Sequence, residues 1–219
     1  MNNNYVIAIT RTCGSGATSI SRILGERLGI NVYDRNLLRL ASDDSGINEE
    51  LFARADEHMK QSLLYRISKK VYNGEIIPPD SNDFTSNDNL FNYQAKVLKE
   101  LAANESFICI GRAADYILKD NPNLITIFIC APMDKCIKRE MELLSFDAKK
   151  AEQHIITTDK YRAGFYKYHT GREWKNPENY DLCLNTGKFD YETCVDIIEN
   201  YIKTRLAGNN SDEKTASIS

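Results

Sequence analysis

The sequence predicts an α/β fold, built as a doubly wound, mainly parallel sheet of five strands. Apolar, β-rich runs recur at residues 5–10, 31–34, 106–111, 124–131 and 180–186, and helical patterns separate them. These runs are continuously apolar rather than alternating, which is typical of strands covered on both faces. Strands separated by helices are typical of parallel crossovers. The pattern therefore favours a parallel sheet between two layers of helices.

Size and charge limit the classes of protein to consider. With 219 residues, 42% of them hydrophobic, the chain is long enough for one well-buried domain, which we expect at 1–206. Its 28 basic and 31 acidic side chains give a formal net charge of −3, so no net field attracts nucleic acid or an anionic membrane. Any anion must be bound by a local arrangement of groups.

The first strand leads into the loop TRTCGSGATS at residues 10–19, and a helical pattern follows. A strand, a glycine-rich turn and a helix place free backbone N–H groups and the positive end of the helix at one point, where phosphate binds. The residues expected to bind a nucleotide phosphate are Gly14, Ser15, Gly16, Ala17, Thr18 and Ser19. The hydroxyl of Thr18 or Ser19 would serve Mg²⁺ or cap the helix. Taken alone, this short signal is equally typical of a structural turn.

The loop lacks the lysine of the pattern GxxxxGK[ST]. Ala17 stands at the lysine position and Arg11 at the first glycine. Arg11 leaves the same strand end, so we expect it to supply the missing positive charge, although its reach and geometry differ from those of lysine. The alternative is a surface arginine in an ordinary ion pair.

Two stretches are too long for simple crossovers. Residues 36–104 separate the second and third strands and contain helical segments and a polar break, NGEIIPPDSNDFTSNDN. Residues 145–178 are charged and aromatic. Long loops in a compact domain are usually binding elements or lids, so we expect an inserted binding element and a lid here. The tail at 207–219 is almost free of apolar residues and is predicted to be disordered.

Further expectations concern the state of the cysteines and the location of the protein in the cell. Six cysteines are scattered without a CxxC pair, and only three histidines accompany them, so the spacing of zinc ligands is absent. Cys109, Cys130 and Cys183 lie in strand-like runs and are expected to be reduced core residues. No apolar run approaches the ~20 residues that a membrane span needs, and the start lacks a signal-peptide pattern. A cytoplasmic protein is expected.

Four blocks of the sequence together resemble a known family. They read ITRTCGSGATSISRILGERLGINVYDRNLL, ICIGRAADYIL, IFICAPMDKCIKRE and TTDKYRAGFYKYHTGREWKNPENYDLCLNT. In this order and spacing they resemble the cytidylate kinase-like family, relatives of the nucleoside monophosphate kinases with the P-loop NTPase fold. The resemblance covers roughly residues 5–206. That family commonly has a loop without lysine, and this sequence departs from its pattern at Ala17 and Thr18.

The resemblance implies transfer of the γ-phosphoryl group of ATP, with Mg²⁺, to a nucleoside monophosphate, CMP or dCMP being favoured. Such transfer needs arginines that reach one point from separate elements. Arg112 directly follows the third strand, at the edge of an open sheet where ligands bind. The resemblance assigns Arg112 and Arg139 to the acceptor phosphate, with Asp115 nearby. Asp159, Lys160 and Arg162 correspond to the lid, and Asp34, followed by Arg35 and Arg39, opens the acceptor region.

Other interpretations of these residues stay open. Arg112 is also consistent with a loop cap, and Arg139 with a solvated basic helix face. The aromatic residues after Arg162 suit packing against the sheet as well as a closed lid. At the level of function, the alternatives are a nucleotide-binding protein or sensor with little turnover, and a kinase with a non-nucleotide acceptor. The expected partners are small-molecule nucleotides, and the oligomeric state is open.

Overall fold

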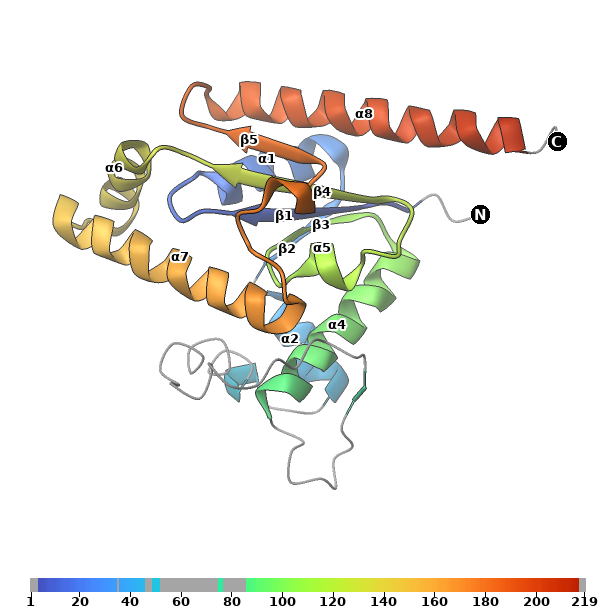
Figure 1. The fold of residues 1–219 in the computed structure, drawn as a ribbon, viewed down its shortest axis with the longest axis horizontal. Helices are drawn as coiled ribbons and strands as arrows, with labels where there is room; N and C mark the ends of the chain where they lie inside the picture. Colours follow the sequence, from blue (N-terminus) through green and yellow to red (C-terminus); the bar gives the residue numbers. More distant parts are fainter. Residues whose placement is uncertain (1–3, 35, 46–48, 52–74, 77–85, 217–219) are drawn as a thin grey trace.

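The computed structural model describes residues 4–34, 36–45, 49–51, 75–76 and 86–216. Five parallel strands form one sheet, in the order β2-β3-β1-β4-β5 (Figure 1). The strands are β1 (Val6–Arg11), β2 (Asn31–Tyr33), β3 (Phe107–Ile110), β4 (Leu124–Cys130) and β5 (Leu182–Asn185). All five lie where the apolar runs predict them, and the parallel α/β sheet is confirmed.

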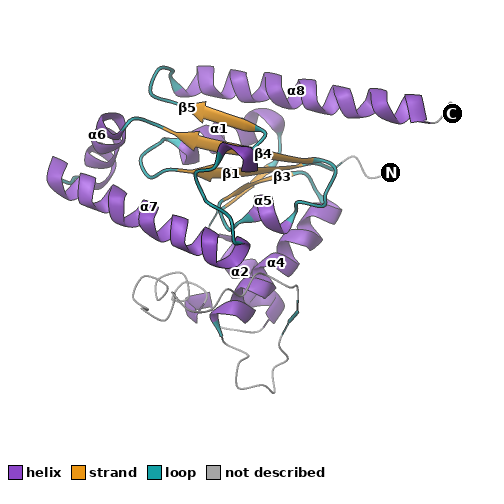
Figure 2. Ribbon diagram, viewed as in Figure 1, coloured by secondary structure: helices purple, strands orange, loops and turns teal. Residues whose placement is uncertain are grey.

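Helices cover both faces of the sheet (Figure 2). One face carries α1 (Ala17–Leu28) and α8 (Tyr191–Ala216). The other carries α2 (Asn36–Ser45), α4 (Asn87–Asn104), α5 (Ala114–Ile117) and part of α7 (Ala148–Thr170). Helix α6 (Met133–Leu144) follows β4 and packs against α7, and a short 3-10 helix, η2 (Pro177–Asn179), precedes β5. No helix in the described ranges is long and apolar enough to cross a membrane.

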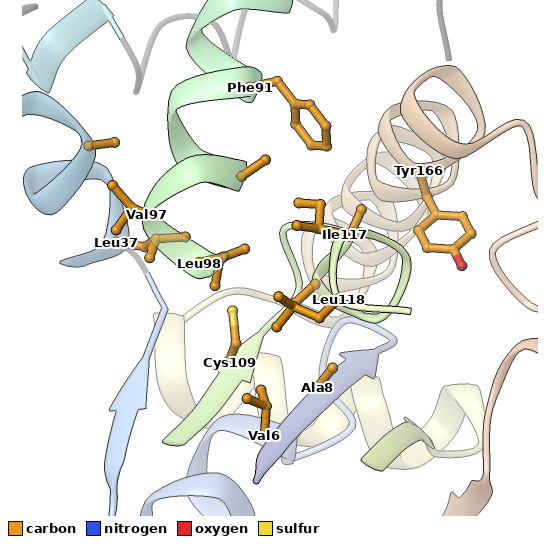
Figure 3. Packing of buried hydrophobic residues seen from close by; sticks show 14 of the residues in the cluster. Val6, Ala8, Leu37, Phe91, Val97, Leu98, Cys109, Ile117, Leu118 and Tyr166 are labelled. Carbon is orange, nitrogen blue, oxygen red and sulfur yellow. The ribbon is translucent and has the colours of Figure 1, made fainter. Parts of the chain in front are cut away.

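Side chains of each central strand alternate between two cores. In β1, Val6 and Ala8 enter the core beneath α4 and α5, whereas Ile7 and Ile9 enter the core beneath α1 and α8. Figure 3 shows Val6 and Ala8 within the first of these cores. Because successive strand residues face opposite sides, a strand buried on both faces needs apolar residues throughout. This requirement explains the unbroken apolar runs in the sequence.

Parallel pairing brings all five carboxyl ends to one edge of the sheet. Arg11 ends β1, Gly111 follows β3, and Thr186 follows β5. β1 lies between β3 and β4, although the chain runs from β1 to β2 first. The strand order therefore reverses beside β1, and open α/β sheets bind ligands outside such a reversal.

Much of the two long stretches is helical. Residues 148–170 form the single helix α7, and the ends of the 36–104 stretch form α2 and α4. The Ser86 hydroxyl caps α4 by accepting a hydrogen bond from the Asn89 N–H at 3.3 Å, so part of the polar break begins a helix. Most of that break lies outside the described residues. Whether these stretches act as a binding element and a lid stays a prediction.

Two local expectations differ from the structure. Cys183 is exposed, because β5 is an edge strand, whereas Cys109 is buried as expected and Cys130 is partly exposed. All six cysteines are free thiols. Helix α8 continues to Ala216, past the start of the predicted disordered tail. A helix that has already formed extends by one hydrogen bond for each added residue, so polar composition alone did not mark its end.

A glycine in α1 gives a test of this packing. A Cβ at Gly25 would lie 2.5 Å from Val32 Cγ2 and 3.1 Å from the Ile30 carbonyl oxygen. Alanine in a helix normally adds about 0.5–1 kcal/mol of stability, but overpacking costs about 1–3 kcal/mol. We expect Gly25→Ala to lower the free energy of unfolding in urea titrations, and Val32→Ala to relieve part of that loss in the double variant. A more stable Gly25→Ala protein would contradict the packing.

Candidate functional site

The glycine loop between β1 and α1 is shaped by two left-handed glycines. Gly14 has φ 72° and Gly16 has φ 81°. A Cβ would lie 2.8 Å from the backbone of Cys136 at Gly14, and 2.6 Å from the ring of Tyr191 at Gly16. Gly16 is the N-cap of α1 and no side chain caps this end. The N–H groups of the first helical turn are therefore available to an anion.

Arg139 of α6 holds the carbonyl side of this loop. Its Nη1 donates hydrogen bonds to the carbonyl oxygens of Ser15 at 2.8 Å and Gly14 at 3.3 Å. The same atom donates to Thr186 Oγ1 at 3.0 Å, and that hydroxyl donates to the Ser15 carbonyl at 2.7 Å. The guanidinium also lies over the Tyr191 ring, 5.4 Å from its centre. Arg139 thus holds the loop carbonyls in place, a positioning role that the sequence did not suggest.

Arg11, Arg112 and Arg162 reach one region from β1, the loop after β3, and α7. The Arg162 Nη1 donates to the Arg11 carbonyl oxygen at 3.4 Å. Burial, together with the positive charges of Arg162 and Arg112, lowers the pKa of Arg11 to about 10. The Asp34 carboxylate, 3.7 Å from Arg11 Nη2, opposes this shift. The positive charges of Arg162 and Arg112 disfavour the charge of Arg11, and an added anion would relieve this repulsion.

A left-handed turn after β3 presents Arg112. Gly111, Arg112 and Ala113 have φ values of 79°, 61° and 53° in succession. For a non-glycine residue this conformation costs about 1–2 kcal/mol, and such strain persists only where the surrounding structure maintains it. A Cβ at Gly111 would lie 2.2 Å from Arg11 Nη1, and the φ of 79° at this position also favours glycine.

Asp159 connects α7 to the glycine loop. Its Oδ1 accepts a hydrogen bond from the Cys13 N–H at 2.7 Å and lies 3.7 Å from Arg162 Nη1. Burial raises the pKa of this carboxyl, and the hydrogen bond from Cys13 and the charge of Arg162 oppose the rise. Asp159 therefore fixes the loop, and through Arg162 it also orients a cation of the cluster.

A cavity of about 1030 Å³ lies in front of the loop and the arginines. Among its lining residues are Arg11, Gly14, Ser15, Gly16, Ala17, Thr18, Ser19, Asp34, Arg112, Arg139 and Arg162. Thr18 and Ser19 are exposed at the start of α1, whereas Ala17 is only 2% exposed and packs in the core. Most of the predicted site residues therefore meet at one cavity.

Four predicted residues lie elsewhere. Lys160 and Arg39 are exposed and are not part of the cavity lining. Asp115 is buried behind that lining, where its Oδ2 accepts a hydrogen bond from the Tyr166 hydroxyl at 2.6 Å. Asp159 acts on the loop from behind. Arg35 lies outside the described residues.

Three residues of the site escaped the sequence reasoning. Thr186 contacts the loop, Tyr191 covers Gly16 and Arg139, and Gly111 makes room for Arg11. Thr186 and Gly111 each follow a predicted strand at its carboxyl end, so their position was a usable signal. Tyr191 begins a helix far along the chain, and nothing local marks its contact with the loop.

The aromatic residues of α7 divide between cavity and core. Tyr161, Phe165 and Tyr166 line the cavity, as does Trp174 beyond the helix. His169 is only 2% exposed and stacks on Phe91 with a centroid separation of 3.8 Å. Burial lowers the pKa of His169 to about 3, so it is neutral and lies away from the cavity lining. His169 is therefore not positioned to act as a general base in this cavity.

Arg11 gives the first test of the site. Because burial and neighbouring cations disfavour its charge, we expect Arg11→Met to raise the free energy of unfolding by about 1 kcal/mol without an anion. When tripolyphosphate is added, the wild type should become more stable than Arg11→Met, since only the wild type gains a partner for Arg11. Thermal unfolding with and without tripolyphosphate measures both effects. If tripolyphosphate shifted the unfolding temperature of the two proteins equally, Arg11 would not be part of the anion site.

His169 gives a test of pH dependence. Its pKa in the folded protein is about 3, below the ordinary value of about 6.5. The unfolded chain therefore binds the proton first as pH falls, and stability is lost below about pH 6.5 by up to about 1.4 kcal/mol per pH unit. We expect His169→Phe to lack this component, so the difference in unfolding free energy between variant and wild type should change between pH 7 and 4.5. Parallel pH profiles would contradict the neutral buried imidazole.

Comparison with known proteins places this geometry in a family. A cytidylate kinase of Fervidobacterium nodosum is 22% identical over 223 residues, covering 91% of this chain and 96% of the relative. A uronate isomerase of Corynebacterium glutamicum is 27% identical over 122 residues, but the match covers 51% of this chain and spans 23% of that protein.

Solved structures show the same fold. An uncharacterized protein from Eubacterium ventriosum has a TM-score of 0.67 and 28% identity, over 91% of this chain and 99% of the other. A shikimate kinase from Bacteroides thetaiotaomicron has a TM-score of 0.52 and 15% identity, over 91% and 98%. The model of the cytidylate kinase-like family matches residues 6–188. With its parallel sheet and its glycine loop at the cavity, the chain belongs to the cytidylate kinase-like family.

Proposed function

We propose that this protein transfers the γ-phosphoryl group of ATP, in the presence of Mg²⁺, to a nucleoside monophosphate, with CMP or dCMP favoured. The observation that carries the proposal is the meeting of Arg11, Arg112 and Arg162, from three separate elements, at the cavity that the start of α1 also lines. Phosphoryl transfer brings two anionic nucleotides together, and its catalysis is mainly positioning and charge stabilisation.

The glycine loop suits the phosphates of ATP. Gly14 and Gly16 have no Cβ, so the loop can pack closely against Cys136 and Tyr191, and the uncapped first turn of α1 offers N–H donors. The exposed Thr18 hydroxyl at the start of α1 is the residue we assign to Mg²⁺. The metal would neutralise negative charge on the phosphate oxygens. Arg11 would supply the positive charge that Ala17 lacks.

The acceptor phosphate is assigned to the ends of β2 and β3. Asp34 and Arg112 line the cavity there, and the charges of Asp34 and Arg112 both influence the pKa of Arg11. In the reaction, an acceptor phosphate oxygen attacks the γ-phosphorus, and the bond from that phosphorus to the β–γ bridging oxygen breaks to release ADP. The arginines would stabilise charge on the transferring group, while α7, as the lid, would exclude water with its aromatic residues.

The preference for a pyrimidine monophosphate draws support from the family and from the named relative. Recognition of a base needs paired polar groups, because a group left unpaired by the wrong base rejects it. Those groups are expected in the 36–104 insert, whose central residues lie outside the described structure. We therefore assign the acceptor class from the family and the phosphate contacts from the geometry.

A coupled assay of ADP release tests the proposal. The panel contains ATP with Mg²⁺ and each ribo- and deoxyribonucleoside monophosphate, with shikimate and gluconate as non-nucleotide acceptors. We expect the highest kcat/KM with CMP or dCMP, and a fall in kcat of at least ~100-fold in Arg11→Ala, the usual order for a lost charge-stabilising group. Arg22→Ala, which changes an exposed arginine of α1 away from the cavity, is the matched control. No turnover above the background ATPase rate with any acceptor would refute the kinase assignment.

A second candidate is a nucleotide-binding protein with little turnover. Ala17 is buried in the core, so no ammonium group enters the cavity from the lysine position of the loop. Micromolar ATP binding by calorimetry, without transfer to any acceptor in the panel, would favour this candidate. Turnover with a non-nucleotide acceptor alone would instead favour a small-molecule kinase.

A further inference from the structure

Three side chains with metal-binding donor atoms meet beside the glycine loop. They are Cys13 of the loop, Glu140 of α6 and His154 of α7, and one donor atom from each lies within 4.8 Å of the others. They come from separate segments of the chain, so no short sequence motif predicts this cluster. The fold, and not the local sequence, creates this cluster.

Two members of the cluster are acidic groups that lie largely out of water. Cys13 is 6% exposed and Glu140 is 8% exposed, so a thiol and a carboxyl group lie largely out of water. Among the described residues, the Glu140 carboxylate has one ionic contact, with His154 Nε2 at 3.7 Å. A buried carboxylate usually has a hydrogen bond or a cation as its partner.

The donor set selects the class of cation. Sulfur, imidazole nitrogen and carboxylate oxygen together are typical ligands of Zn²⁺, whereas Mg²⁺ prefers oxygen ligands alone. Metal–ligand bonds of about 2.0–2.3 Å in a tetrahedron separate the ligand atoms by about 3.3–3.8 Å. The donor atoms here lie within 4.8 Å of each other. We expect rotation of the side chains to bring them to the distances of a tetrahedral site without a change in the backbone.

We propose that Cys13, Glu140 and His154 form a three-ligand site for a Zn²⁺-class cation, with the fourth position open to the cavity. All three residues line that cavity, which leaves room for a water molecule or an anionic oxygen as fourth ligand. The ion would join the loop to the α6–α7 hairpin, whose Arg139 and Asp159 already hold the loop by hydrogen bonds. This inference does not depend on the proposed kinase activity.

Zinc titration of the full chain without nucleotide, in competition with a chromophoric chelator, tests the site. We expect one Zn²⁺ per chain, and at least ~10-fold weaker binding in Cys13→Ser, Glu140→Gln and His154→Ala, since loss of a group that merely supports a ligand already costs 10–100-fold. Cys183→Ser and Cys136→Ser are matched controls. Cys183 is exposed on β5, and Cys136 is buried in the same small core as Cys13 but outside the ligand group. Both controls should bind as the wild type does.

Cobalt binding gives a readout that does not depend on the variants' stability. We expect wild-type protein with Co²⁺ to show a thiolate-to-cobalt charge-transfer band, which Cys13→Ser lacks and Cys183→Ser retains. Thermal unfolding in EDTA identifies any variant that does not fold. If a ligand variant does not fold, the cobalt spectra of the wild type and of Cys183→Ser test the site instead. Wild-type protein without stoichiometric zinc binding or without the thiolate band would overturn the proposal. Unchanged affinity in all three ligand variants would overturn it as well.

Discussion

Parallel pairing of all five strands is the constraint on which the site depends. Because all strands end at the same edge, the residues at the carboxyl ends of β1, β2, β3 and β5 lie near one another although they are far apart in sequence. Arg11, Asp34 and Arg112 are neighbours for this reason. A slip of one residue in β1 would turn Arg11 to the opposite face of the sheet and exchange its two apolar sets. The two cores of the sheet therefore fix the direction of the cations as well as the stability of the fold.

The site concentrates unfavourable terms that the rest of the fold offsets. Arg112 has a left-handed backbone, Arg11 has a charge that its surroundings disfavour, and one Asp115 carboxylate oxygen is buried without a hydrogen-bond partner among the described residues. Each of these is of the order of 1–3 kcal/mol. They lie next to a sheet whose central strands are almost fully buried. Arg11 and Arg112 line the cavity, and Asp115 is buried behind it, so the unfavourable terms lie where a rigid scaffold maintains them.

The sequence was informative where a local pattern has one physical meaning. Unbroken apolar runs located the strands, and residues directly after those runs, such as Arg112, were predicted at the edge of the sheet. It was uninformative where meaning depends on packing. The long helix α7 was expected as a loop because its charged and aromatic residues show weak periodicity, and Cys183 was expected in the core because an edge strand reads like a central one. The direction of Arg139 and the meeting of Cys13 with His154 depend on contacts between distant segments.

The contact between Gly111 and Arg11 has a consequence for how this site changes in evolution. Any side chain at position 111 would enter the space of the Arg11 guanidinium, and the backbone there has φ 79°. Substitutions at the two positions are therefore not independent, since neighbours in contact show interaction energies that single changes do not reveal. A relative without glycine at this place should also have a short side chain at the end of β1. We therefore expect that a change of Gly111 alone, or of its neighbour alone, costs more than a joint change of the two positions.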